Sequence, residues 1–148
     1  EDPRFIARRF VIFASEDIGN ADPLALVVAN SAMQAVENIG MPEGRIILAQ
    51  AVTYLATAPK SNASYMGIEA ALADIKETKT QDVPMHLRNA NYKGEKEMGK
   101  GKGYKYPHSF SGYVEQEYMP EKKKYYEPKD IGYEKKIRER MGRLNEKE

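Results

Sequence analysis

Residues 46–59 carry no charged side chain, in a chain where 30% of residues are Asp, Glu, Lys or Arg. This stretch lies between Arg45 and Lys60, and its strongly polar residues, Gln50, Thr53 and Thr57, share one narrow strip of a helix. A helix this apolar is covered over most of its surface. The pattern leaves two arrangements open. The segment is the central helix of the chain's own core, or one of its flanks packs against another subunit.

Four helices are expected in the first half of the chain. Asp-Pro pairs at residues 2–3 and 22–23 start the first two, because an Asp side chain caps free N–H groups and Pro suits the first helical turn. A third helix is expected at residues 42–58, before a Pro that stops it. The fourth begins at Ser61 or Asn62, either of which can serve as its cap.

Apolar residues at helical spacing predict which faces of these helices turn inward. The predicted inward residues are Phe5, Ile6, Phe10 and Phe13 in the first helix, Leu24, Val27, Val28, Ala35 and Ile39 in the second, and Tyr65, Ile68, Leu72 and Ile75 in the fourth. Together they predict an all-α fold, with a helical bundle whose four-helix core occupies residues 1–78.

The second half of the chain differs in composition. Residues 79–129 lack a helical pattern and are rich in Gly, Tyr and Lys, which predicts an irregular extension fastened by aromatic rings. A C-terminal helix is expected at residues 130–148, with an apolar edge made of Tyr133, Ile137, Met141 and Leu144. We therefore expect a single domain over residues 1–148.

Charge is distributed unevenly along the chain. Residues 1–75 contain 5 Lys and Arg against 9 Asp and Glu, a net charge of −4, whereas residues 76–148 contain 18 against 13, a net charge of +5. Lysines that follow phosphates and rings that stack on bases are what single-stranded nucleic acid binding requires. The candidate contact residues are Arg88, Lys100, Lys102, Tyr104, Lys105, Lys122, Lys123 and Lys124. Alternatively, the tyrosines of residues 100–126 fasten this segment to the bundle while its lysines face solvent.

Several kinds of site have no support in the sequence. The chain has no Cys, which excludes a thiolate nucleophile and a Cys-based zinc site. No G-x-x-x-x-G-K-[ST] phosphate loop is present, and the glycine-rich residues 100–103 lack a hydroxyl residue after Lys and a preceding apolar strand. We therefore expect no catalytic, cofactor-binding or metal-binding residue. No apolar run approaches the roughly 20 residues of a membrane helix, so a cytoplasmic location without membrane contact is expected.

Four short motifs occur in order along the chain. They are ASEDIGNADP at residues 14–23, APKSNA at 58–63, HLRNA at 86–90 and GKGYKYPH at 101–108. Together they resemble the C-terminal region of the RarA/MgsA family of replication-associated recombination AAA+ ATPases, which are similar to clamp loaders. The resemblance covers most of the chain.

This resemblance implies that the chain is the C-terminal part of a longer protein, with a collar-like helical domain that assembles as a homotetramer. For the full-length protein it implies a DNA-dependent ATPase at stalled replication forks, with ATP and Mg²⁺ bound upstream, and DNA and single-strand-binding protein as partners. It carries no catalytic residue onto this chain. The expected function is a non-catalytic tetramerisation domain in DNA replication and repair. The alternative is a single-stranded nucleic-acid-binding module that uses residues 100–126.

Overall fold

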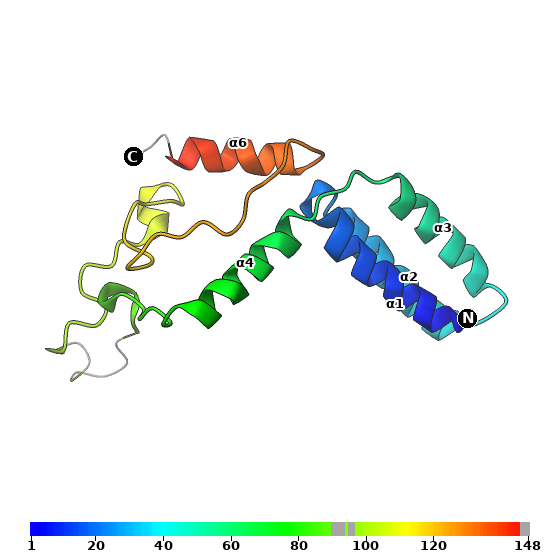
Figure 1. Ribbon diagram of the computed structural model, residues 1–148, viewed down its shortest axis with the longest axis horizontal. Helices are drawn as coiled ribbons and strands as arrows, with labels where there is room; N and C mark the ends of the chain where they lie inside the picture. The colour runs from blue at the N-terminus through cyan, green and yellow to red at the C-terminus, as the bar shows by residue number, and fades with distance from the viewer. Residues whose placement is uncertain (90–93, 95–96, 146–148) are drawn as a thin grey trace.

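The structure is a computed structural model that describes residues 1–89, 94 and 97–145 (Figure 1). Its α-helices are α1 (Pro3–Phe13), α2 (Leu24–Ile39), α3 (Gly44–Thr57), α4 (Ala63–Glu77) and α6 (Glu134–Asn145), and its shorter helical turns are η1 (Ala14–Ile18), η2 (Gly19–Ala21), η3 (Met85–Leu87) and η4 (Pro107–Phe110). The described residues contain no β-strand, so the predicted all-α class is confirmed. Ala90 of one sequence motif and residues 146–148 of the expected last helix lie outside the described residues.

The first two helices begin at the residues that the sequence indicates. Asp2 precedes α1, and its Oδ1 accepts a hydrogen bond from the Arg4 N–H at 2.9 Å. In the same way, Asp22 Oδ1 accepts a hydrogen bond from the Leu24 N–H at 3.1 Å at the start of α2. Each carboxylate satisfies a donor that has no partner inside the helix. The later boundaries shift, since α3 begins at residue 44 rather than 42 and α6 at residue 134 rather than 130.

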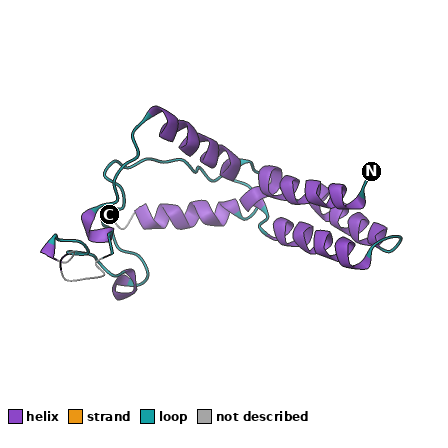
Figure 2. Cartoon of the chain, turned by 90° about the horizontal axis from the view of Figure 1, so that it is seen from below, coloured by secondary structure: helices purple, strands orange, loops and turns teal. Residues whose placement is uncertain are grey.

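Helices α1, α2 and α3 pack as a three-helix bundle in which α2 contacts both of its neighbours (Figures 1 and 2). The buried core residues are Ala14, Ile18, Ala25, Ala29, Leu55 and Ala58. Phe10 and Phe13 pack around this core as expected, whereas Phe5 is exposed. Because most core residues are alanines, the helix backbones approach closely and the core is narrow.

The predicted inward face of α2 is wrong. The buried residues are Ala25, Ala29, Ala32 and Val36. Leu24, Val27 and Ile39, which were expected inside, are exposed, and Val28 and Ala35 are half-buried. Residues 24–36 carry no charge, so apolar periodicity alone does not select a face. The alanine face of α2 is the buried one because it lets the backbone of α2 pack closely against α1 and α3.

Helix α3 is not the central helix of the chain. Only Gly44, Ala51 and Leu55 are buried in it, while Ile46 is 63% exposed and Val52 is 44% exposed. The central position belongs to α2 instead. The interpretation of this segment as the central helix of the chain's own core is therefore wrong. The alternative, that one flank of α3 packs against another subunit, stays a prediction.

Helix α4 leaves the bundle, which differs from the four-helix packing expected at residues 1–78. It begins beside η1 and η2 and extends away from the other helices (Figure 1). The physical reason lies at its start, where the Ser61 N–H donates a hydrogen bond to the Ile18 carbonyl at 3.3 Å. This contact fixes the loop before α4 to the end of the first helical segment and so sets the direction of α4.

The chain beyond α4 holds little core of its own, as expected for an irregular extension. Among the described residues after α4, the buried apolar side chains are Val114 and Pro128. Residues 121–130, which we call the strap, run back beside α4 toward the bundle, and α6 begins where the strap ends (Figures 1 and 2). The expected apolar edge of α6 is half-buried at Ile137, Met141 and Leu144 and exposed at Tyr133.

Candidate interaction surfaces

The bundle, α4 and α6 meet at a single place, where three short turns contact one another. We call this place the junction, and it consists of residues 18–21, 58–62 and 129–134. The Tyr133 N–H donates a hydrogen bond to the Ala21 carbonyl at 2.7 Å, which joins the turn before α6 to η2. Lys129 Nζ donates to Asn62 Oδ1 at 2.6 Å, which joins that turn to the loop before α4.

Two glycines bring these backbones together. Gly19 and Gly132 have φ values of 51° and 52°, in the region that L side chains rarely adopt. A Cβ on Gly132 would lie 2.1 Å from the Ala21 carbonyl oxygen, and a Cβ on Gly19 would lie 2.8 Å from the Ser61 carbonyl oxygen. The junction is therefore built on direct contact between backbones that no larger residue permits.

A buried carboxylate connects the side chains of the junction. Glu134, the first residue of α6, is 0% exposed. Its Oε2 accepts hydrogen bonds from Ser61 Oγ at 2.6 Å and from the Lys129 N–H at 2.9 Å. Its Oε1 accepts one from the Tyr126 hydroxyl at 2.8 Å. These three bonds, from the loop before α4 and from the strap, satisfy a charge that would otherwise be costly to bury.

The motifs at residues 14–23 and 58–63 supply much of this junction. Asn20 donates from Nδ2 to Ser64 Oγ and to the Tyr126 hydroxyl, both at 3.3 Å. Burial raises the pKa of Tyr126, and its hydrogen bond to the Glu134 carboxylate raises it further. The tyrosine hydroxyl therefore stays protonated at neutral pH and remains a donor to the carboxylate.

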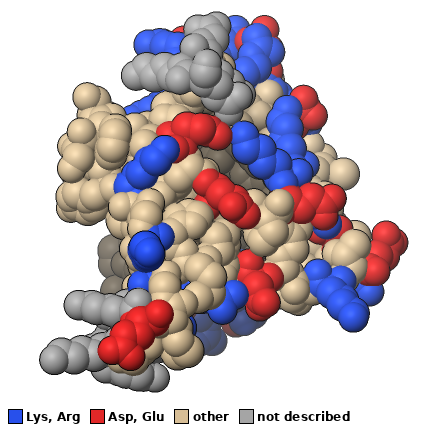
Figure 3. Space-filling model, turned by 90° about the vertical axis from the view of Figure 1, so that its left-hand side faces the viewer, with Lys and Arg blue, Asp and Glu red and all other residues tan. Residues whose placement is uncertain are grey.

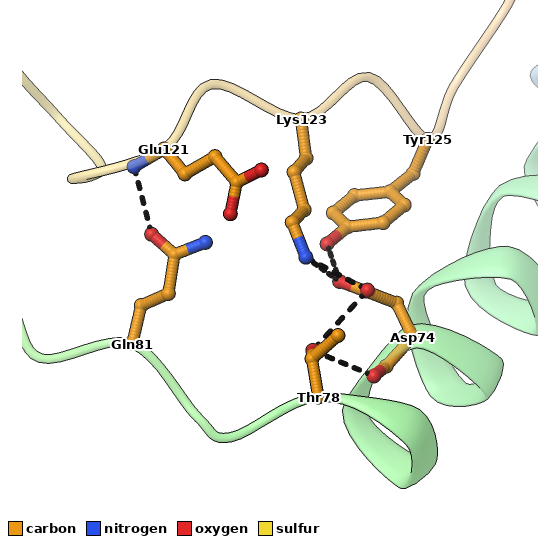
Figure 4. A network of polar contacts seen from close by, with 6 residues as sticks. All are labelled: Asp74, Thr78, Gln81, Glu121, Lys123 and Tyr125. Atoms are coloured by element: carbon orange, nitrogen blue, oxygen red, sulfur yellow. Dashed lines mark hydrogen bonds and ion pairs between the residues drawn. The ribbon is translucent and has the colours of Figure 1, made fainter.

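A second polar cluster fastens the strap to the far end of α4 (Figure 4). Lys123 Nζ contacts both carboxylate oxygens of Asp74, at 2.7 and 2.8 Å, and the Tyr125 hydroxyl donates to Asp74 Oδ2. Thr78 donates to the same carboxylate at 3.2 Å. Beside them, the Glu121 N–H donates to the Gln81 side chain. We call Asp74, Lys123 and Tyr125 the clasp.

Within the clasp, Asp74 and Lys123 stabilise each other's charged forms, and Asp74 stabilises the neutral form of Tyr125. The hydrogen bond from Lys123, followed by that from Tyr125, lowers the pKa of Asp74, and the Asp74 partner raises the pKa of Lys123. Donation to Asp74 also raises the pKa of Tyr125. The contribution of Asp74 to stability is thus present above the ordinary carboxyl pKa and lost as the pH falls through its lowered value. The contributions of Lys123 and Tyr125 are present below their ordinary pKa values and lost as the pH rises through the raised ones.

Asp74→Ala is expected to loosen the strap while leaving the bundle folded. The change removes the acceptor shared by Lys123 and Tyr125, so strap amides should exchange their hydrogens faster at neutral pH. Hydrogen–deuterium exchange of peptides covering residues 113–130 measures this. Glu77→Ala, on the exposed side of the same helix, is the control and should leave the exchange unchanged. Equal exchange in both variants would mean that the clasp does not hold the strap.

Three of the nucleic-acid candidates are occupied by contacts within the chain. Lys123 belongs to the clasp, and its side chain is 19% exposed. Arg88 Nε donates to the Val83 carbonyl at 2.6 Å, and Lys105 Nζ donates to the Glu115 carbonyl at 3.1 Å. In this structure Arg88 therefore satisfies a carbonyl of its own loop.

Of the remaining five candidates, four are exposed and one is half-buried. Lys122 pairs with Glu115 and Lys124 with Glu127, each at 3.2 Å between exposed side chains. The other candidates are Lys100, which is half-buried, and Lys102 and Tyr104, which are exposed. Surface pairs of this kind hold their partners weakly, so these lysines can exchange a carboxylate for another anion. Nucleic acid binding by the eight candidates stays a prediction.

Charges of both signs are mixed in this part of the molecule. On the face in Figure 3, Lys and Arg side chains alternate with Asp and Glu and do not gather into one basic patch. A hollow of about 670 Å³, lined by residues between 113 and 124, likewise contains Glu115 and Glu117 as well as Lys122 and Lys124. Such a surface attracts a polyanion less strongly than a row of lysines would.

The apolar stripe of α4 faces solvent, so its predicted inward orientation is wrong. Tyr65, Ile68, Leu72 and Ile75, which we call the α4 seam, are 41%, 54%, 45% and 57% exposed. The strap lies on a different flank of the helix, where a Cβ on Gly67 would lie 3.4 Å from the Tyr125 carbonyl oxygen. The small residue allowed the strap backbone to approach this flank, which left the larger side chains uncovered.

Neither a metal centre nor a membrane-spanning helix is found among the residues that the structure describes. Among residues 1–89, 94 and 97–145, no group of three or more His, Asp or Glu side chains could hold a metal ion. None of the described helices combines the length and the apolar character that crossing a membrane requires.

The amino-acid sequence of this chain is similar to a known protein family and to several bacterial proteins. The family described as "MgsA AAA+ ATPase C terminal" matches residues 1–145. Replication-associated recombination protein A of Bacillus subtilis is 49% identical over 135 residues, which cover 88% of this chain and 32% of that protein. The protein of the same name from Escherichia coli K12 is 47% identical over 152 residues, with 99% of this chain and 34% of that protein covered. That of Coxiella burnetii is 46% identical over 145 residues, with 95% and 33% covered. The chain spans about a quarter to a third of the length of the relatives it matches.

Proposed function

The chain belongs to the family of MgsA AAA+ ATPase C-terminal domains, and on this premise we propose that it is the non-catalytic domain through which a replication-associated ATPase forms homotetramers. The match over residues 1–145 confirms the resemblance that the four sequence motifs indicated. The relatives named replication-associated recombination protein A support a role of the longer protein in replication-associated recombination. In our proposal this protein also acts in DNA repair, at stalled replication forks.

In this proposal the chain assembles the enzyme and performs no chemistry itself. ATP and Mg²⁺ bind in an AAA+ portion of the longer protein that lies outside this chain. DNA, on which the ATPase activity depends, and single-strand-binding protein are partners of the full-length protein, which works in the cytoplasm.

One observation carries the assembly proposal: large apolar side chains face outward on three different helices. They are Leu24, Val27 and Ile39 of α2, Ile46 and Val52 of α3, and the α4 seam. Monomeric proteins rarely expose extended apolar surface, and such surface marks sites of protein association. Burying it between copies removes it from water, at about 25 cal/mol for each Å² of apolar area.

The solution mass of the chain tests this proposal. At tens of micromolar concentration, light scattering behind a sizing column is expected to give four times the 16.8 kDa of one chain. Dilution should shift the mass downward, because association depends on concentration. A mass of one chain throughout this range would contradict the proposal.

A second candidate function is binding of single-stranded nucleic acid by residues 100–126. The observation that favours it is a group of surface rings, since Tyr104, Tyr106 and Phe110 are 46%, 58% and 50% exposed. Exposed rings can stack on bases at about 1–3 kcal/mol per base. Tyr104→Ala is then expected to weaken binding of a single-stranded oligonucleotide about tenfold at low salt, measured by fluorescence anisotropy. Absence of binding by the unmodified chain at low salt would exclude this function.

A further inference from the structure

The α4 seam has the spacing of a coiled-coil contact. Its four residues lie at positions i, i+3, i+7 and i+10, which are the a, d, a and d positions of two heptads. All four are exposed, and α4 extends away from the bundle (Figure 1). Side chains at these positions normally insert between the side chains of a facing helix. The seam thus has the form of one half of a helix pair.

The strap covers one edge of the seam and leaves the other edge free. It contacts Gly67 and holds Asp74 through the clasp, and both residues occupy c positions of the heptad. Ser64 and Ala71, at the g positions, line a shallow hollow with Tyr125 and Tyr126 on the same side, and Ile68 of the seam also lines it. A second helix can therefore reach the seam only from the side of the e positions. These are Glu69 and Lys76, both exposed.

We propose that the α4 seam pairs antiparallel with the α4 seam of a second copy of this chain, about a two-fold axis that crosses the helix pair at its middle. The proposal rests on the homotetramer proposed above and specifies one of its contacts. Antiparallel pairing sets Tyr65 opposite Ile75 of the second copy and Ile68 opposite Leu72 of the second copy, so that each a position meets a d position.

Charge complementarity favours a second copy of this chain as the partner of the seam, and it favours antiparallel over parallel pairing. In an antiparallel pair the e positions of the two helices face each other, which brings Glu69 beside Lys76 of the second copy, and the symmetry repeats this pair. In a parallel pair the e positions face the g positions, which are the uncharged Ser64 and Ala71. Only the antiparallel arrangement therefore gives both exposed charges an opposite partner.

A contact of this kind closes at two copies, because each copy uses the same surface. A tetramer then needs a second contact on another surface. The outward apolar residues of α2 and α3 lie on different helices from the seam and provide it. The antiparallel α4 pair would thus join two halves of the assembly.

Charge reversal tests the direction of pairing. Glu69→Lys and Lys76→Glu, made singly, are each expected to raise the dissociation constant of the assembly about tenfold at low salt, because each change turns two attractions into two repulsions. The double variant restores both pairs with exchanged signs and should recover most of the loss. Glu77→Lys makes the same charge change on the exposed side of α4 and serves as the control. Sedimentation velocity across a dilution series measures all four.

Cysteine pairing tests the register, since the chain contains no Cys of its own. A Tyr65→Cys chain mixed with an Ile75→Cys chain should form a disulfide-linked pair on mild oxidation. Neither variant should form one alone, because like residues then lie about 15 Å apart along the helix pair, beyond the roughly 7 Å that a disulfide allows between Cα atoms. Both substitutions are at exposed positions, so we expect the variants to fold.

The outcomes separate this inference from the function on which it rests. Crosslinking only in the mixture, together with recovery in the double charge variant, supports the antiparallel α4 pair. Crosslinking of each variant with itself would indicate parallel pairing and overturn the proposal. Stable assembly that responds to none of these changes would overturn it while leaving the tetramer in place. A chain that stays monomeric would overturn both.

Discussion

Gly132→Ala is expected to lower the free energy of unfolding by about 3 kcal/mol or more. Gly132 has a φ of 52°, and its new Cβ would lie 2.1 Å from the Ala21 carbonyl oxygen and 3.0 Å from the Pro59 ring. The carbonyl belongs to the backbone and cannot turn away without breaking its hydrogen bond from the Tyr133 N–H. The turn before α6 must therefore move off η2, and the junction opens.

Urea unfolding followed by circular dichroism, at one fixed protein concentration, measures this loss. Gly142→Ala is the matched control, because Gly142 lies within α6 with nothing within 4 Å of the new Cβ. Alanine stabilises an exposed helix interior, so this variant should gain about 0.5–1 kcal/mol. If Gly132→Ala and Gly142→Ala changed the free energy of unfolding by the same small amount, the close backbone contact at the junction would not be needed for stability.

Glu134→Ala is expected to cost about 3 kcal/mol of the free energy of unfolding. The change leaves the Ser61 hydroxyl, the Tyr126 hydroxyl and the Lys129 N–H without their acceptor in a buried place. The hydroxyls can turn toward other acceptors, but the backbone N–H is fixed in direction. Each donor that stays unsatisfied costs about 1–3 kcal/mol, and the loss is measured by the same urea unfolding.

Glu134→Gln separates the shape of this side chain from its charge. The amide oxygen can still accept hydrogen bonds from Ser61 and Lys129, and the amide nitrogen then donates to the Tyr126 hydroxyl. We expect a loss of about 1 kcal/mol, between the unmodified chain and the alanine variant. Glu139→Ala removes an exposed carboxylate from the same helix and should change stability by less than about 0.5 kcal/mol. If Glu134→Ala cost no more than Glu139→Ala, the glutamate would not be the centre of the junction.

Both predictions bear on assembly because the junction sets the direction of α4. In our proposal, the α4 seam meets its partner only while the loop at residues 58–62 stays fixed to η1 and η2. A variant that opens the junction should therefore weaken self-association more than its loss of stability alone would. The motifs at residues 14–23 and 58–63 therefore have a structural role, because they form much of the junction between the bundle and α4.

Some features of the site carried no signal in the sequence. A glutamate in the first turn of a helix is favourable beside the helix dipole while fully exposed, so nothing marked Glu134 as buried. Gly132 is one of 11 glycines, and only its contact with Ala21 distinguishes it. Asp74 was not expected to bind Lys123 because the two residues are far apart in sequence and meet only when the strap runs along α4.

The sequence by itself determined the all-α class, the Asp caps that start α1 and α2, the irregular character of the extension and the family. These follow from local chemistry, since caps, glycines, prolines and short motifs act within a few residues of one another. Only the tertiary structure decided which faces of α2 and α4 turn inward, which helix is central and which lysines are occupied. The reason is that α2 and α4 carry small residues on one face and large apolar residues on another. An apolar pattern indicates that a face is to be covered, but the shape of the neighbouring backbone decides what covers it.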